Sequence, residues 1–327
     1  MLGWIAAAGA AVAGWALAPK LFGRSKPEVN MQSTAQTKPS ARGMQAVFAP
    51  GPEHWVGDGF YVKTVFWPQI DAQMLSPFLL LDHAARKSFD ASPYRRGVGE
   101  HPHRGFETVT FAYEGEVEHR DSAGGGGRIG PGDVQWMTAA SGVVHEEKHS
   151  QAFSERGGDF EMVQLWVNLP ASKKMSEPRY QPLLDREFPR LQLGAAEARL
   201  VAGELAGEKG PARTHTPITT FDLRFHEEGS SEFELPLGWT TLVFPLEGDL
   251  SAGPKRERIA SRHFGVFDRS DDGAVQLHAN AGARVLVLAG EPLDEPVVAY
   301  GPFVMNTREE IGQAFRDYQS GRMGKLL

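Results

Sequence analysis

The chain has 327 residues, a formal net charge of −7 and no cysteine, with 41% hydrophobic and 23% charged residues. This length fits two domains of ordinary size, and the composition is that of a folded protein rather than a disordered one. The missing thiols exclude disulfides, thiolate metal sites, iron–sulfur clusters and cysteine catalysis. An acidic chain without a long block of Lys and Arg is also unsuited to direct binding of nucleic acid.

The first segment, residues 2–19, carries no charge and consists mostly of Ala, Gly, Leu, Val, Ile and Trp. It is just long enough to cross a bilayer, which takes roughly 17–25 apolar residues. Because Lys20, Arg24 and Lys26 follow it, an anchor here would leave the rest of the chain in the cytoplasm. We therefore expect a cytoplasmic protein tethered through residues 2–19. A cleaved signal peptide without its usual basic start and a helix lying on a surface remain open as alternatives.

After this segment, residues 20–45 predict a flexible polar linker, because they have no hydrophobic period. Short runs of β-branched and aromatic residues then alternate with turn residues, which indicates strands. A polar interval at 170–178 divides these runs into two halves of similar length. We predict an all-β fold with two tandem domains at 46–170 and 179–306, built from barrels or sandwiches.

Residues 307–327 predict a short C-terminal helix and tail. Thr307 is a suitable N-cap, and Glu310 stands three residues later as its capping-box partner. Apolar residues then recur at helical spacing on one face, at Ile311, Phe315 and Tyr318.

Four consecutive glycines, Gly124 to Gly127, invite comparison with a phosphate-binding loop. A true P-loop continues into Gly-Lys-Ser/Thr and a helix, whereas this stretch continues into Arg128 and a Gly-Pro-Gly-Asp turn. We therefore predict a flexible hairpin loop after the strand at 116–121. His119 of that strand is expected to be a surface or hairpin residue.

Histidines and carboxylates at alternating positions carry the functional signal. His101 and His103 flank Pro102, and His145 precedes Glu147 by two residues. Alternate side chains of a strand share a face, so each pair points the same way. If the two segments lie side by side in a β-barrel, three imidazoles and one carboxylate converge. Such a set suits a first-row transition metal with positions left open for other ligands.

Several segments resemble the signature segments of the pirin family, within the cupin superfamily. The similarity runs from about residue 46 to 325 and leaves the first forty-odd residues unexplained. The matching segments are His101–Thr110, Pro131–Ala139, His145-X-Glu147, Asp82-His83, Gln164–Pro170 and Gly301–Thr307.

This resemblance implies two tandem cupin domains, each a jelly-roll β-barrel, with a metal in the N-terminal barrel only. Carried over by position, the ligands fall on His101, His103, His145 and Glu147. Glu107 stands where the general cupin pattern has its carboxylate ligand, and we expect it to orient a ligand imidazole instead. The resemblance implies one divalent metal per chain, with Fe(II) expected first. Cu, Ni, Mn and Zn stay open, because imidazole and carboxylate suit several metals.

The same resemblance implies a function. Bacterial pirin-like proteins include quercetin 2,3-dioxygenases, which open the heterocyclic ring of a flavonol with O2 and release carbon monoxide. We expect an oxidoreductase of this class, with Glu147 accepting the proton of the substrate hydroxyl. The alternative is a non-enzymatic, iron-dependent, redox-responsive regulator that acts through protein partners. A structural metal combined with other small-molecule chemistry is the third hypothesis.

Overall fold

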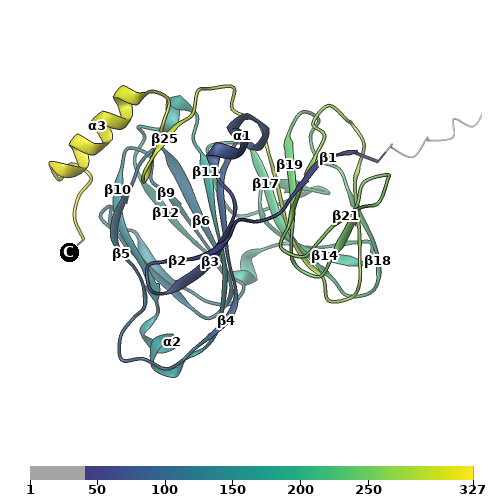
Figure 1. Cartoon of the computed structure of the whole chain (residues 1–327), viewed down its shortest axis with the longest axis horizontal. Coiled ribbons are helices and arrows are strands. Elements are labelled where there is room, and N and C mark those ends of the chain that lie inside the picture. The colour runs from purple at the N-terminus through teal and green to yellow at the C-terminus, as the bar shows by residue number, and fades with distance from the viewer. Residues whose placement is uncertain (1–40, 327) are drawn as a thin grey trace, which may run out of the picture. The chain divides into compact units, whose positions relative to one another are not determined.

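The computed structural model describes residues 41–326 of the chain. In this part no helix is long and apolar enough to span a bilayer. The expected anchor at 2–19 and most of the expected linker lie outside the described residues. What is described consists mainly of antiparallel strands arranged as two β-barrels (Figure 1).

The first barrel is built from a seven-stranded sheet and a four-stranded sheet. The large sheet has the strand order β12-β9-β6-β11-β4-β3-β2, and the small one β5-β10-β7-β8. Two helices connect strands of this barrel, α1 (Pro68–Leu75) and α2 (Gln151–Arg156). The strands are β2 (Glu53–Val56), β3 (Phe60–Phe66), β4 (Phe78–Phe89), β5 (Gly97–His103), β6 (Phe106–Glu114), β7 (Val117–Asp121), β8 (Gly126–Ile129), β9 (Val134–Thr138), β10 (Val143–His149), β11 (Gly158–Asn168) and β12 (Arg179–Leu183).

The second barrel repeats this plan with sheets β1-β22-β19-β24-β17-β14-β13 and β18-β23-β20-β21. Its interior is packed with apolar side chains such as Phe221, Val243 and Leu277. The strands are β1 (Met44–Phe48), β13 (Arg190–Leu193), β14 (Ala196–Ala202), β17 (Ile218–Phe225), β18 (Gly229–Phe233), β19 (Thr240–Glu247), β20 (Leu250–Ala252), β21 (Glu257–Ile259), β22 (Phe264–Phe267), β23 (Val275–Ala279) and β24 (Arg284–Gly290). A short hairpin, β15 (Glu204–Leu205) with β16 (Glu208–Lys209), extends one loop.

Alternation along β6 explains why both faces of the large sheet of the first barrel are buried. Thr110 lies on the inner face and reaches Glu147 of β10. Its neighbours Val109 and Phe111 face the other way and join a core with Leu242 and Phe244 of the second barrel. One face of this sheet therefore serves the first barrel's interior, and the other joins the two barrels.

Each end of the described chain packs with the barrel that is formed by the other half of the sequence. Strand β1 pairs with β22 of the second barrel, whereas β12 completes the large sheet of the first. The hairpin of β25 (Val298–Tyr300) and β26 (Phe303–Met305) and the helix α3 (Arg308–Gln319) return to the first barrel. There α3, yellow in Figure 1, packs beside β10. The pairings of β1 and β12 cross the expected domain bounds, 46–170 and 179–306, which stay predictions.

The capping box of α3 forms as the sequence predicts. The Thr307 hydroxyl accepts the backbone N–H of Glu310, and the Glu310 carboxylate accepts the backbone N–H of Thr307. The apolar face of the helix, including Ile311 and Ala314, packs against Val144 of β10. The predicted C-terminal helix is confirmed, and it closes one side of the first barrel.

Candidate metal centre

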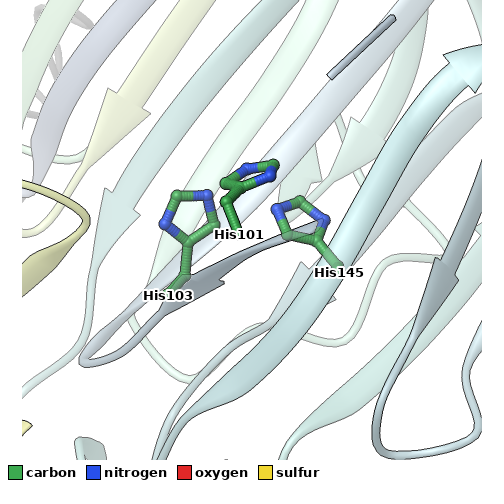
Figure 2. Close-up of side chains that lie close together, drawn as sticks. All are labelled: His101, His103 and His145. Carbon is green, nitrogen blue, oxygen red and sulfur yellow. The ribbon is translucent and has the colours of Figure 1, made fainter. Parts of the chain in front are cut away.

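Two adjacent strands bring three predicted ligands together. Strand β10 pairs with β5 so that His145 stands opposite His101, and Val143 stands opposite His103. One donor atom from each of His101, His103 and His145 lies within 4.8 Å of the other two. Figure 2 shows the three imidazoles turned toward one another. The expected convergence of the two histidine segments is therefore present.

Hydrogen bonds leave one nitrogen of each ring available. The Nδ1 of His101 donates to the carbonyl of Gly99 at 2.8 Å, and the Nδ1 of His103 donates to the carbonyl of Pro302 at 3.2 Å. The Nε2 atoms of these two rings then carry lone pairs. The Nε2 of His145 is buried with no hydrogen-bond partner among the described residues. These two lone pairs and the unpartnered Nε2 of His145 converge in a way that fits a transition metal ion.

Burial also favours the neutral form that a ligand must have. Desolvation, with the nearby imidazole of His101, lowers the pKa of His103 and His145 well below the usual value. A neutral ring keeps the lone pair that binds a metal, whereas an imidazolium has none. The site is therefore electrostatically prepared for a cation near neutral pH.

Glu147 lies beside this trio and is held by amide donors. Its carboxylate lies within 4.8 Å of donor atoms of His119 and His145. The side-chain amide of Gln135 donates to one of its oxygens, and that of Gln164 donates to the other at 3.4 Å. Among the described residues, no group within 4.8 Å contains all four expected ligands. The three histidines thus form the core of the site, with Glu147 adjacent.

A pocket of about 200 Å³ opens beside the histidines. Its polar wall includes His101, His103, Glu147, Gln164 and Asp82. Burial raises the pKa of Asp82, although a hydrogen bond from Thr64 opposes the shift. The rest of the wall is apolar and comes from Val56, Phe60, Val62, Val98, Met162 and Trp166. This combination of apolar walls and a few convergent polar groups is typical of a small-molecule site.

Comparison with known proteins agrees with this geometry. The sequence pattern of Pirin matches residues 60–167, and that of the Pirin C-terminal cupin domain matches residues 220–324. A Pseudomonas aeruginosa protein provisionally named quercetin 2,3-dioxygenase is 52% identical over 278 residues, which are 84% of this chain and 96% of that protein. The chain belongs to the pirin family.

Two further relatives of this pirin-family protein are similar over most of their length. Human pirin is 37% identical over 255 residues, covering 76% of this chain and 83% of the human protein. The crystal structure of quercetin 2,3-dioxygenase from Acinetobacter baumannii is 44% identical, with a TM-score of 0.84. That likeness covers 88% of this chain and 100% of the solved one. The expected architecture of two tandem cupin barrels is confirmed.

Glu107 does not have the expected role in this pirin-family protein. It is fully buried, and one of its oxygens accepts the Thr138 hydroxyl at 2.6 Å. Its neighbour Val109, two residues along β6, packs in the core that joins the barrels. Glu107 therefore lies on the face of the sheet that points away from the histidines. The prediction that it orients a ligand imidazole is wrong.

His119 is expected at the surface from the sequence, yet in the structure it is a neighbour of the candidate metal site. It is only 2% exposed, and its Nδ1 lies 3.4 Å from the Nδ1 of His145. Strand β7 pairs with β10 so that His119 stands opposite Glu147, and Asp121 stands opposite His145. The spacing of His119 and Asp121, two residues apart on a strand, is the one sequence signal that could have revealed this pair.

Proposed function

We propose that this pirin-family protein is a metal-dependent dioxygenase that opens the ring of a flavonol or a similar aromatic enol with O2. The observation that carries the proposal is the cluster of three histidines with free nitrogens at the end of a mainly apolar pocket. The quercetin 2,3-dioxygenase names of two similar proteins support the choice of reaction.

His101, His103 and His145 would hold the metal through their Nε2 atoms, and Glu147 would be the fourth protein ligand. We expect one divalent ion per chain, Fe(II) first, with Cu, Ni, Mn or Zn as alternatives because these ligands suit several metals. When bound, the ion supplies Lewis acidity and a meeting point for O2 and the substrate oxygen.

Glu147 is the residue that would accept the substrate's hydroxyl proton. It is 7% exposed and lines the same pocket as His101 and His103. The amides of Gln135 and Gln164 hold its carboxylate in place. The single proton of the Thr110 hydroxyl is better placed for Gln164 Oε1 at 2.6 Å than for Glu147 Oε1 at 3.2 Å. The Glu147 carboxylate therefore keeps lone pairs beyond those that the two amides use.

The pocket walls would select a flat, apolar substrate and exclude water from the reacting edge. Phe60, Trp166 and Met162 offer surfaces on which an aromatic ring can pack. The pocket, at about 200 Å³, is smaller than the roughly 300–1,000 Å³ of a typical ligand site. We therefore expect the hydroxyl-bearing edge of a flavonol to enter and the far ring to remain at the mouth.

The test is a turnover assay on protein purified without oxygen and loaded with one metal at a time. Addition of quercetin should consume O2 and release carbon monoxide in equal amounts, in at least one metal form. Metal-loaded protein that leaves quercetin and O2 untouched in every form would contradict the proposal. Capture of a protein partner in only one redox state of the metal would then favour the regulator hypothesis.

A further inference from the structure

A chain of hydrogen bonds runs from Asp121 through His119 to the ligand His145. The Nε2 of His119 lies 3.1 Å from Asp121 Oδ2, and its Nδ1 lies 3.4 Å from the Nδ1 of His145. All three side chains are buried. The Gly124–Gly127 loop has no role in the proposed function. It contacts Asp121 through the backbone N–H of Gly125, which donates to Asp121 Oδ1.

The positions of the protons along this chain follow from simple chemistry. A carboxylate only accepts, so the proton between Asp121 and His119 sits on His119 Nε2. A neutral imidazole has one N–H, which makes His119 Nδ1 an acceptor, and the Nδ1 of His145 must donate to it. The Nε2 of His145 is then unprotonated, as a metal ligand requires.

We propose that Asp121 and His119 are positioning residues that fix the tautomer and the ring orientation of His145. The proposal rests on the metal site of the proposed function and adds the outer residues that prepare one of its ligands. Neither residue contacts the substrate pocket: both are absent from its lining.

The glycine loop holds the carboxylate of Asp121 through backbone hydrogen bonds. The backbone N–H groups of Ala123 and Gly125 donate to Asp121 Oδ1 at 2.8 and 2.9 Å, which leaves Oδ2 for His119. A side chain at Gly125 would overlap Asp121 Oδ2 and would lie 2.6 Å from Tyr180 Cβ. The ring of Tyr180 in turn stacks on His119, with centroids 4.8 Å apart and planes 10° from parallel. Loop and ring together hold the Asp121–His119 pair from two sides.

The sharpest test is Asp121→Asn, read by ¹⁵N NMR of histidine-labelled, metal-free protein. The backbone N–H groups of Ala123 and Gly125 both donate to the Oδ1 position of residue 121. The side-chain oxygen of the asparagine therefore takes this position, and its NH2 group faces His119 Nε2. His119 must then carry its proton on Nδ1, and the proton of His145 moves to Nε2. We expect the Nδ1–H form of His145 in the wild type and the Nε2–H form in the variant.

Asp133→Asn is the matched control. Asp133 also accepts two backbone N–H groups, from Gly130 at 3.0 Å and Asp185 at 2.9 Å, but within residues 41–326 no hydrogen bond joins it to an imidazole. This variant should leave the tautomer of His145 unchanged. An Nδ1–H form of His145 in folded Asp121→Asn protein would overturn the proposal.

Metal affinity, measured by competition with a chelator, gives a second readout. Loss of an outer partner of a ligand histidine weakens metal binding by roughly 10–100-fold. We expect this loss for Asp121→Asn and His119→Leu, and recovery in His119→Gln, whose amide oxygen can accept the Nδ1–H of His145. Equal affinities in His119→Leu and His119→Gln would contradict the proposal. If the wild type bound no metal, the proposed function would fail, while the tautomers of the metal-free protein would still decide this inference.

Discussion

His103 donates its Nδ1 proton to the carbonyl of Pro302, 3.2 Å away, although 199 residues separate the two in sequence. The hairpin that carries Pro302 is fixed to the first barrel by Lys174. The ammonium group of this fully buried lysine donates to the carbonyls of Gly105 and Val304 and to Asn168, at 2.6–3.0 Å. The C-terminal segment thus forms part of the surroundings of a predicted metal ligand.

The ion pair between Arg104 and Asp317 holds α3 to the first barrel, at 2.8 Å. Removal of one partner of such a buried pair costs about 3–5 kcal/mol, because the other charge stays buried. Asp317→Asn should therefore lower the free energy of unfolding by this amount or less. The loss is limited because Arg104 keeps its hydrogen bond to the carbonyl of Ser141. Chemical denaturation measures the loss, and Asp249→Asn, at an exposed pair with Arg258, is the control.

The same ion pair should make stability depend on acid. Although burial raises it, hydrogen bonds from Arg322 and Arg104 bring the pKa of Asp317 down to about 2. An unfolded aspartate titrates near 3.9, so the stabilisation is complete above pH ~4 and is lost as the pH falls toward 2. Melting temperatures of the wild type and Asp317→Asn should converge over this range. A constant difference between them would contradict the assignment.

Replacement of a single histidine of the cluster should abolish stoichiometric metal binding. His101→Ala and His145→Ala each remove one of the three converging nitrogens, so the weakened site should not keep one ion per chain through purification. Metal analysis after purification gives the result, and a single cooperative thermal transition of each metal-free protein checks folding. His54→Ala, at an exposed histidine outside the cluster, should keep its metal.

Glu147→Gln separates metal binding from proton transfer. The amide retains an oxygen that can bind the ion but does not act as a base, so part of the metal should stay while turnover of quercetin falls by at least the roughly 100-fold that a general base contributes. Metal content and the rate of O2 consumption are measured on the same sample. Full turnover in this variant would remove Glu147 from the role of base.

Glu107→Gln should stabilise the protein at neutral and alkaline pH. Burial raises the pKa of Glu107 to about 7, so the folded state holds its proton where the unfolded state has lost it. Stability of the wild type therefore falls as the pH rises from ~4 to ~7. At pH 8 the variant should be more stable by up to about 3 kcal/mol, and the two proteins should converge near pH 4. Urea denaturation at several pH values checks whether the difference in stability grows from pH ~4 to pH 8 as expected.

Local sequence pattern was enough to predict the histidine cluster but not its surroundings. The spacing of His101 with His103 and of His145 with Glu147 fixes a common face, because each pair lies within one strand. Glu107 has the same odd parity, but the turn at Gly105, with a φ of +89°, ends β5 and begins a new strand. Counting alternate residues across that turn would place Glu107 on the same face as His101 and His103, whereas it lies on the opposite face of the sheet.

Contacts between distant segments were beyond the reach of the pattern. His119 is a neighbour of His145 only because β7 pairs with β10. The residue pattern within each strand does not indicate which other strand it pairs with. The place of β1 in the second barrel is likewise a long-range choice, since Met44–Phe48 precedes every strand of the first. Which strands pair is decided by the packing of the whole chain.

The hydrogen bond from His103 to Pro302 also sets an order of events during protein synthesis. The ribosome produces the three histidines and the whole first barrel long before it produces Pro302, Val304 and the helix that follows them. In a nascent first barrel, His103 therefore lacks its hydrogen-bond acceptor Pro302, and Lys174 lacks Val304, one of its three hydrogen-bond acceptors. The three histidines have all of these surrounding hydrogen bonds only in the finished chain. A chain that stops before Pro302 would keep the histidines but would leave His103 without the hydrogen bond that orients its ring.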